Sequence, residues 1–156
     1  MAVRQSPWAT FNLGAARPYE YGDVVSQDFY FDVAATAGNG LLAADIVDLG
    51  VLPAGAVVVD AILFVEGTAI AATNATVGIL TGTPGNLLAD DGVSARVLGT
   101  EMYNAVALSN SAPVRLPGLP TAIAKSNVDR SIGLQVSANV VAQASKIHVR
   151  TWYAAG

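Results

Sequence analysis

Residues 56–66 decide the fold class, and they read Ala-Val-Val-Val-Asp-Ala-Ile-Leu-Phe-Val-Glu. The run is rich in β-branched and aromatic residues, which favour strands. Apolar residues recur at every second position along it: Val57, Val59, Ala61, Leu63 and Val65. This alternation predicts a strand with one buried face, while the opposite face, with Asp60 and Glu66, is partly wetted.

Shorter strands are predicted on both sides of this one. They are residues 24–34, 46–49, 76–81, 95–98, 105–108, 114–116, 130–140 and 146–153. Turn residues separate them; in Pro53-Ala54-Gly55, for example, Pro53 suits the second and Gly55 the fourth position of a type I turn. No segment has a sustained period of 3.6 residues, and residues 41–47 suit at most one helical turn. Many short strands joined by frequent turns predict an all-β chain, an antiparallel β-sandwich that is jelly-roll-like.

Two of these strands alternate clearly. In residues 24–34 one side carries Phe29, Phe31 and Val33. In residues 146–153 one side carries Ile147, Val149 and Thr151, and the other carries Lys146, His148 and Arg150. We expect the first set of each strand to face the core.

Residues 1–22 differ from the rest, because they contain prolines, glycines and aromatics with no clear period. They predict an extended N-terminal arm, followed by a β-sandwich domain over residues 23–156. Large aromatic side chains are unfavourable in water, so we expect the arm to dock on its own domain, on a neighbouring copy or on another protein. The candidate partner contacts in the arm are Trp8, Phe11, Tyr19 and Tyr21.

Charge is scarce, since Asp, Glu, Lys and Arg make up only 13% of 156 residues and the net charge is −4. The hydrophobic share of 53% excludes a disordered chain, and the low charge excludes a coiled coil. No basic stripe exists, so we expect no nucleic-acid partner. The longest charge-free stretch, residues 67–89, contains polar residues and glycines, so we expect no membrane partner. A small monomer with so few charges favours burial among other chains.

The two signs of charge are separated along the chain. Residues 18–95 hold ten acids and no Lys or Arg, whereas residues 96–156 hold six basic residues and two acids. One interpretation is that loops simply carry unlike charges. The other is that complementary faces meet between copies or with a partner. The candidates for such charge contacts are Arg96, Arg115, Arg130 and Arg150.

Catalytic motifs are not found. Residues 38–43 fit the letters of a dinucleotide-binding glycine motif, but Gly50 and Pro53 interrupt the chain too soon for the helix that motif needs, so Asn39-Gly40 is interpreted as a turn. The only histidine, His148, has no Gly-x-Ser-x-Gly partner motif and is interpreted as solvated or at an interface. We therefore predict a protein without enzymatic activity, catalytic residues or cofactors.

Metal sites are not indicated either. There is no cysteine, which excludes disulfides and thiolate ligands. The pair Asp90-Asp91 before Gly92, and the pair Asp45 and Asp48, lack the spacing of an EF-hand, and the first is typical of a turn. The sequence therefore predicts no metal site.

Residues 48–58, Asp-Leu-Gly-Val-Leu-Pro-Ala-Gly-Ala-Val-Val, resemble a turn-and-strand pattern common in small virion proteins of tailed bacteriophages. Residues 77–79, 84–89 and 147–153 look similar to such proteins too. The resemblance is greatest to capsid decoration (cement) proteins. It implies a β-sandwich without catalytic residues, a homo-oligomer (a trimer), that binds the major capsid protein at the capsid surface of the virion after synthesis in the host cytoplasm.

Two alternatives stay open at this point. One is a tail-fibre, baseplate or receptor-binding component of the virion. The other is a carbohydrate-binding β-sandwich module, in which arm aromatics together with Trp152 and Tyr153 would stack on sugars.

Overall fold

The computed structural model describes residues 3–6, 9, 23–36, 40–43, 45–70, 73–108, 112–117, 123 and 125–155. Most of the predicted arm therefore lies outside the described residues. The strands are β1 (Val3–Gln5), β2 (Val24–Asp32), β3 (Ile46–Leu52), β4 (Ala56–Gly67), β5 (Asn74–Leu80), β6 (Tyr103–Ala107), β7 (Val114–Arg115), β8 (Arg130–Val136) and β9 (Ser145–Ala155).

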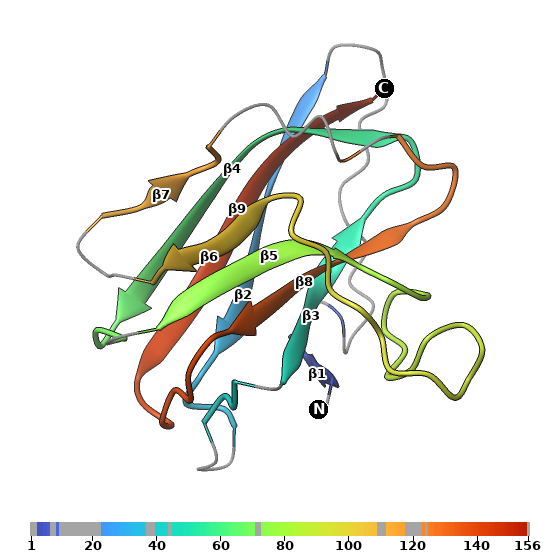
Figure 1. The fold of residues 1–156 in the computed structure, drawn as a ribbon. Coiled ribbons are helices and arrows are strands. Elements are labelled where there is room, and N and C mark those ends of the chain that lie inside the picture. The colour runs from blue at the N-terminus through green and yellow to red at the C-terminus, as the bar shows by residue number, and fades with distance from the viewer. Residues whose placement is uncertain are drawn as a thin grey trace.

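The strands form two sheets that face each other, so the predicted all-β sandwich is confirmed (Figure 1). One sheet has the order β1-β3-β8-β5-β6 and the other has the order β2-β9-β4-β7. Every strand pair is antiparallel except β1 and β3, which run parallel.

The core between the sheets follows the alternation that the sequence predicts for two strands. In β2 and the residue after it, Phe29, Phe31 and Val33 are buried, and in β9 so are Ile147, Val149 and Thr151. Each strand contributes one apolar face, and the two faces pack together as the hydrophobic effect requires.

The prediction for β4 is wrong at its beginning. Ala56 and Val58 are buried there, whereas Val59 is 39% exposed. The pairing of β4 with β9 shifts between Val58 and Asp60, so Val59 is the extra residue of a β-bulge. The bulge reverses the phase of the alternation, and from Ala61 onward the predicted face is buried.

The turn before β4 lies one residue later than predicted. The N–H of Ala56 donates to the carbonyl of Pro53 at 3.1 Å, so Pro53 is the first residue of the turn. Gly55 is the third residue and has φ +78°, which a type II turn requires at that position.

Residues 81–102, which join β5 to β6, form a long segment that we call the 81–102 loop. Its last part returns beside β5, because the N–H of Gly99 donates to the Ile79 carbonyl and the N–H of Met102 to the Val77 carbonyl. The predicted strand 95–98 is replaced by two isolated bridges, Leu88 to Ala95 and Leu80 to Leu98. The middle of the loop projects beyond the strands (Figure 1).

Candidate functional site

Arg96, predicted from sequence as a partner contact, is instead fully buried beneath the 81–102 loop. Its guanidinium makes five hydrogen bonds, as many as its five N–H groups allow. The acceptors are the carbonyls of Thr81 (2.5 Å), Asn86 (2.8 Å) and Gly82 (3.4 Å), the Oγ of Ser131 (2.7 Å) and the Oδ2 of Asp48 (2.6 Å). Its charge is thus used inside the chain, where it holds three loop carbonyls against the sheet.

Asp48, in β3, is the anion that matches Arg96, and it too is fully buried. Its Oδ2 also accepts from the Ser131 hydroxyl at 3.0 Å and from the N–H of Gly85 at 3.2 Å. Its Oδ1 is buried with no hydrogen bond to any residue that the structure describes. Such a pair is favourable only while both ions are present, because either one alone would be an uncompensated buried charge.

The first strand is tied to the same region. β1 pairs with β3, and the N–H of Ser6 donates to the Asp48 carbonyl at 2.8 Å. The Arg4 Nε lies 2.6 Å from Asp45 Oδ2, and the Gln5 amide donates to the Gly85 carbonyl in the 81–102 loop. The start of the predicted arm therefore docks on its own domain, whereas Trp8, Phe11, Tyr19 and Tyr21 lie outside the described residues.

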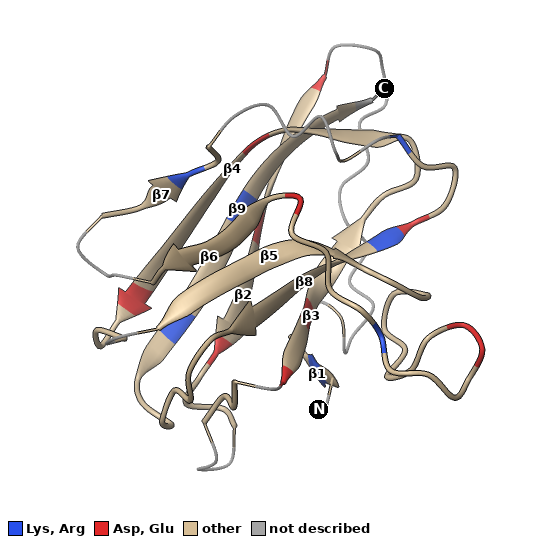
Figure 2. Ribbon diagram, in the orientation of Figure 1, with Lys and Arg blue, Asp and Glu red and all other residues tan. Residues whose placement is uncertain are grey.

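The 81–102 loop carries four exposed apolar side chains, which we call the apolar patch. They are Leu87 (58% exposed), Leu88 (43%), Val93 (82%) and Val97 (62%). Exposed apolar side chains on one projecting segment make that segment a candidate surface for contact with another molecule. In Figure 2 the projecting part of the loop has an acidic segment at its end and a basic one at its base.

Two aspartates fix the shape of this loop. Asp90 Oδ1 accepts from the N–H (2.7 Å) and the hydroxyl (2.8 Å) of Thr83, and Asp91 Oδ1 accepts from the N–H groups of Val93 (2.9 Å) and Ser94 (2.8 Å). The Thr83 hydroxyl lowers the pKa of Asp90, and the Ser94 hydroxyl lowers the pKa of Asp91. The predicted turn is confirmed, and its carboxylates serve as local acceptors.

Arg115 and Arg150 both pair within the chain at the surface. Arg115 is 76% exposed and donates from Nε to Asp60 Oδ2 at 2.8 Å, and this bonding raises the Arg115 pKa. Arg150 is 45% exposed and lies 2.9 Å from Asp28 Oδ2. Exposed pairs of this kind contribute little to stability, so little is lost if either pair is broken. Because both arginine side chains are exposed, they are accessible to a partner.

His148 is buried within the chain, so the solvated interpretation is wrong, while the alternative of an interface histidine stays a prediction. It is 7% exposed and stacks on Phe64, with ring centroids 4.5 Å apart and an angle of 8° between the planes. Its Nδ1 lies 3.2 Å from Asp28 Oδ1, and its Nε2 lies 3.2 Å from Glu66 Oε2 in a geometry unsuited to a hydrogen bond. Phe64 therefore has one face covered by a ring of the same chain.

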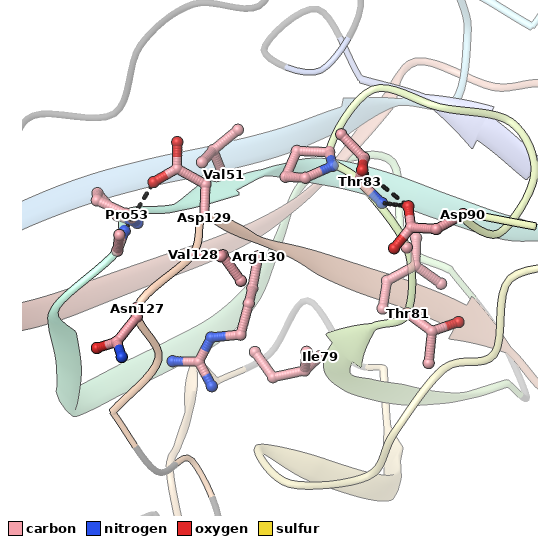
Figure 3. A pocket seen from close by; sticks show the side chains of 14 residues that line it. Val51, Pro53, Ile79, Thr81, Thr83, Asp90, Asn127, Val128, Asp129 and Arg130 are labelled. Carbon is pink, nitrogen blue, oxygen red and sulfur yellow. Dashed lines mark hydrogen bonds between the residues drawn. The ribbon is translucent and has the colours of Figure 1, made fainter.

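Arg130 lies in an open depression of about 1050 Å³ (Figure 3). The walls come from the turn after β3, from the end of β5 and the loop that follows it, and from residues 127–130. Figure 3 shows the guanidinium between Asn127 and Ile79. The depression and Arg130 thus lie on the sheet that carries the 81–102 loop.

Neither a metal-binding cluster nor a membrane-spanning helix is found among the described residues. In the described part of the chain no three His, Asp or Glu side chains come close enough to hold a metal ion. Among these same residues no helix has the length and hydropathy needed to cross a membrane.

The pairing of Asp48 with Arg96 was missed from sequence, although one signal pointed to it. Asp48 stands among apolar residues in a strand that the pattern predicts to be buried, and a buried carboxylate needs a partner. The partner is 48 residues away, and nothing in the sequence selects it among the eight basic residues.

Comparisons with known proteins agree with the fold. No protein-family model matches the sequence, and no curated protein matches it significantly. A chain in a solved structure, the capsid of Ralstonia phage GP4, is 30% identical and aligns with a TM-score of 0.80 over 99% of each chain.

Two other solved structures align less closely. A chain of the acid-stable capsid of Helicobacter pylori bacteriophage KHP30 is 18% identical, with a TM-score of 0.44 over 86% of this chain and 90% of its own. A chain of the capsid of cyanophage Pam1 is 20% identical, with a TM-score of 0.48 over 94% of this chain and 96% of its own. At these TM-scores neither supports an argument.

Proposed function

Because this chain belongs to a family of structural proteins of the bacteriophage virion, the family of the aligned chain in the Ralstonia phage GP4 capsid, we propose that it is a decoration (cement) protein. It binds the outer surface of the capsid and stabilises it there, without catalysis. The observation that carries this proposal is the alignment over 99% of both chains with a TM-score of 0.80. Because the aligned chain comes from a capsid, the proposal favours the capsid over the tail.

The contact surface that we propose for the capsid includes the apolar patch on the 81–102 loop. A flexible loop would lose conformational entropy on binding and weaken the contact. Here Arg96 and Asp48 hold the base of the loop, while Asp90 and Asp91 hold its end. Such bracing supports binding, since the patch is already ordered before the partner arrives.

The partner is, in this proposal, the major capsid protein, and the decoration protein is a trimer on the capsid surface. The aromatic arm residues Trp8, Phe11, Tyr19 and Tyr21, with the exposed Arg115 and Arg150, are proposed as further contacts. Only 13% of the residues are charged, which supports burial of much of the surface in the assembly. Light scattering of the purified protein tests the trimer, which is expected to have three times the mass of one chain.

The proposed function is tested by adding the purified protein to expanded capsids that lack it. We expect saturable binding in co-sedimentation and a higher melting temperature of the capsids. Binding to tails alone in electron micrographs would favour the tail location. If the protein neither binds the capsids nor raises their melting temperature, the proposal is wrong.

A further inference from the structure

Arg130 differs from the other three arginines predicted as contacts, because its guanidinium has no partner among the described residues. The side chain makes no hydrogen bond and no ion pair with any of them, and its Nε and Nη2 atoms are buried. Arg96 makes five hydrogen bonds, and Arg115 and Arg150 each pair with an aspartate. Burial lowers the pKa of Arg130, while the charge of Glu101 acts in the opposite direction. A partly buried guanidinium with no acceptor among the described residues is unfavourable, and an acceptor from another molecule would offset this cost.

The position of Arg130 explains why its donors are buried. It is the first residue of β8 and lies opposite Leu52 of β3. By alternation it points to the same side of β8 as Ile132 and Leu134, which are core residues. Arg130 therefore stands where the apolar core meets the depression, and its guanidinium lines the depression between Asn127 and Ile79 (Figure 3).

The walls around Arg130 combine polar and apolar side chains, with a modest excess of apolar surface. The apolar residues include Val51, Pro53, Ile79, Pro84 and Val128, the last of which is 65% exposed. Two aspartates on the rim are engaged elsewhere. Asp129 Oδ1 accepts from the N–H of Ala54 at 2.7 Å, and Asp90 accepts from Thr83. Neither aspartate makes a hydrogen bond or an ion pair with Arg130.

We propose that the Arg130 depression is a binding site for an aspartate or glutamate side chain, carried with apolar neighbours on a segment of an adjacent capsid chain. The fork of the guanidinium matches a carboxylate, and a charged hydrogen bond of this kind is stronger than a neutral one. A volume of about 1050 Å³ accommodates several side chains, and the apolar parts of the walls favour apolar residues that flank the acid. The proposal rests on the proposed function, because the occupant belongs to the capsid.

The test compares the wild type with Arg130→Met, which keeps an unbranched apolar stem and removes the guanidinium with its charge. Binding to expanded capsids is measured by co-sedimentation, and stability of the free protein is measured by urea unfolding. We expect capsid affinity to fall at least about tenfold, because a charged hydrogen bond is lost. We also expect the free protein to be no less stable than the wild type, since an unpaired buried charge has been replaced by an apolar side chain. Lys146→Met on β9, in the other sheet, loses the same charge and is expected to bind as the wild type does.

Unchanged capsid affinity of Arg130→Met would overturn the proposal. So would lower stability of the free variant with unchanged affinity per folded molecule, which would make Arg130 a purely structural residue. If the variant instead loses self-association in light scattering while its capsid affinity is unchanged, the occupant is a second copy, and the proposed source is wrong.

A second experiment separates this proposal from the proposed function. Butyrate, a carboxylate on a short apolar tail, is titrated into the isolated protein while the Arg130 Nε–H resonance is followed by NMR. We expect a saturable shift with butyrate and none with butyramide, its neutral analogue. If the wild type fails to bind capsids, the proposed function fails, and the butyrate titration still decides whether Arg130 forms a carboxylate site; no saturable shift would exclude that site.

Discussion

The Nη1 atom of Arg96 lies 2.6 Å from Oδ2 of Asp48, and neither side chain has any exposed surface. This contact joins the 81–102 loop to β3 and is the only ion pair among the described residues with both side chains fully buried. The desolvation of two ions offsets much of their attraction, so the pair contributes little net stability. Its main effect is to hold the 81–102 loop in place.

Arg96→Met is expected to destabilise the protein by about 3–5 kcal/mol, since it leaves Asp48 as an uncompensated buried charge. Adding Asp48→Asn to Arg96→Met removes that charge, so the double variant is expected to be more stable than Arg96→Met alone. Urea unfolding measures the free energy of unfolding of the wild type, of Arg96→Met and of the double variant. Arg115→Met, which breaks an exposed pair, is the matched control and is expected to cost about 1 kcal/mol or less. A double variant less stable than Arg96→Met would contradict the stated role of the pair.

The apolar patch predicts a separation of binding from stability. Leu87→Asp and Val93→Asp place charge on side chains that are 58% and 82% exposed, so the stability of the free protein is expected to change by no more than about 0.5 kcal/mol. Capsid affinity is expected to fall at least about tenfold, because a charge would be desolvated in the contact. Val141→Asp, at a residue 72% exposed outside the loop, is expected to bind normally. Equal affinity of all three variants in co-sedimentation would remove the patch from the contact.

Close approach of the returning loop to β5 requires glycine at position 78. A Cβ atom there would overlap the carbonyl of Gly99 and the carboxylate of Glu101. Gly78→Ala is therefore expected to push the main chain of the loop away and to destabilise the protein by about 1–3 kcal/mol in urea unfolding. In Gly133→Ala the atom nearest to the added Cβ is at the end of the Leu98 side chain, 2.7 Å away. Because this side chain is able to move, we expect a smaller loss of stability than in Gly78→Ala. The opposite order of the two variants would contradict this account.

Tyr103 connects the two sheets. From β6 its hydroxyl reaches the carbonyls of Ala61 (2.9 Å) and Val114 (3.1 Å) in the other sheet. Tyr103→Phe is expected to cost about 1 kcal/mol at neutral pH, since a buried hydrogen bond is lost.

The same residue predicts a loss of stability in alkali. Burial, with a smaller effect of the charge on Asp60, raises the pKa of Tyr103 above its ordinary value of 10.0. The folded state then favours the neutral phenol, so its contribution is complete below pH 10 and is lost as the pH rises further. The wild type is expected to lose more stability than Tyr103→Phe between pH 8 and pH 11, by urea unfolding at each pH. Equal losses in the two proteins would refute the assignment, because the remaining tyrosines are the same in both.

The strands with strict alternation were predictable, and the bulge was not. Phe29 and Phe31 in β2, and Ile147 and Val149 in β9, are separated by polar residues, so only one phase buries apolar side chains. In β4 the three consecutive valines at 57–59 satisfy either phase. The choice is made by pairing with β9, which is a tertiary contact and leaves no mark on the local pattern.

The candidate site was predictable only as a set of residue types. Arg96, Arg115, Arg130 and Arg150 all looked like surface cations, because exposure depends on contacts between residues far apart in the chain. Arg96 is enclosed by β3, β8 and its own loop, and Arg130 lines a depression built from three segments. Enclosure of this kind follows from the topology and is not encoded next to the arginine itself.

β8 and β9, the last two strands in the sequence, are internal strands of their sheets. β8 lies between β3 and β5, and β9 lies between β2 and β4. During synthesis the earlier strands emerge first, so the sheet of β1, β3, β5 and β6 lacks its internal strand until β8 has been made, and the sheet of β2, β4 and β7 lacks its internal strand until β9 has been made. Until then β2, β3, β4 and β5 have unpaired edges, and the nascent chain has to be kept from aggregating during that interval.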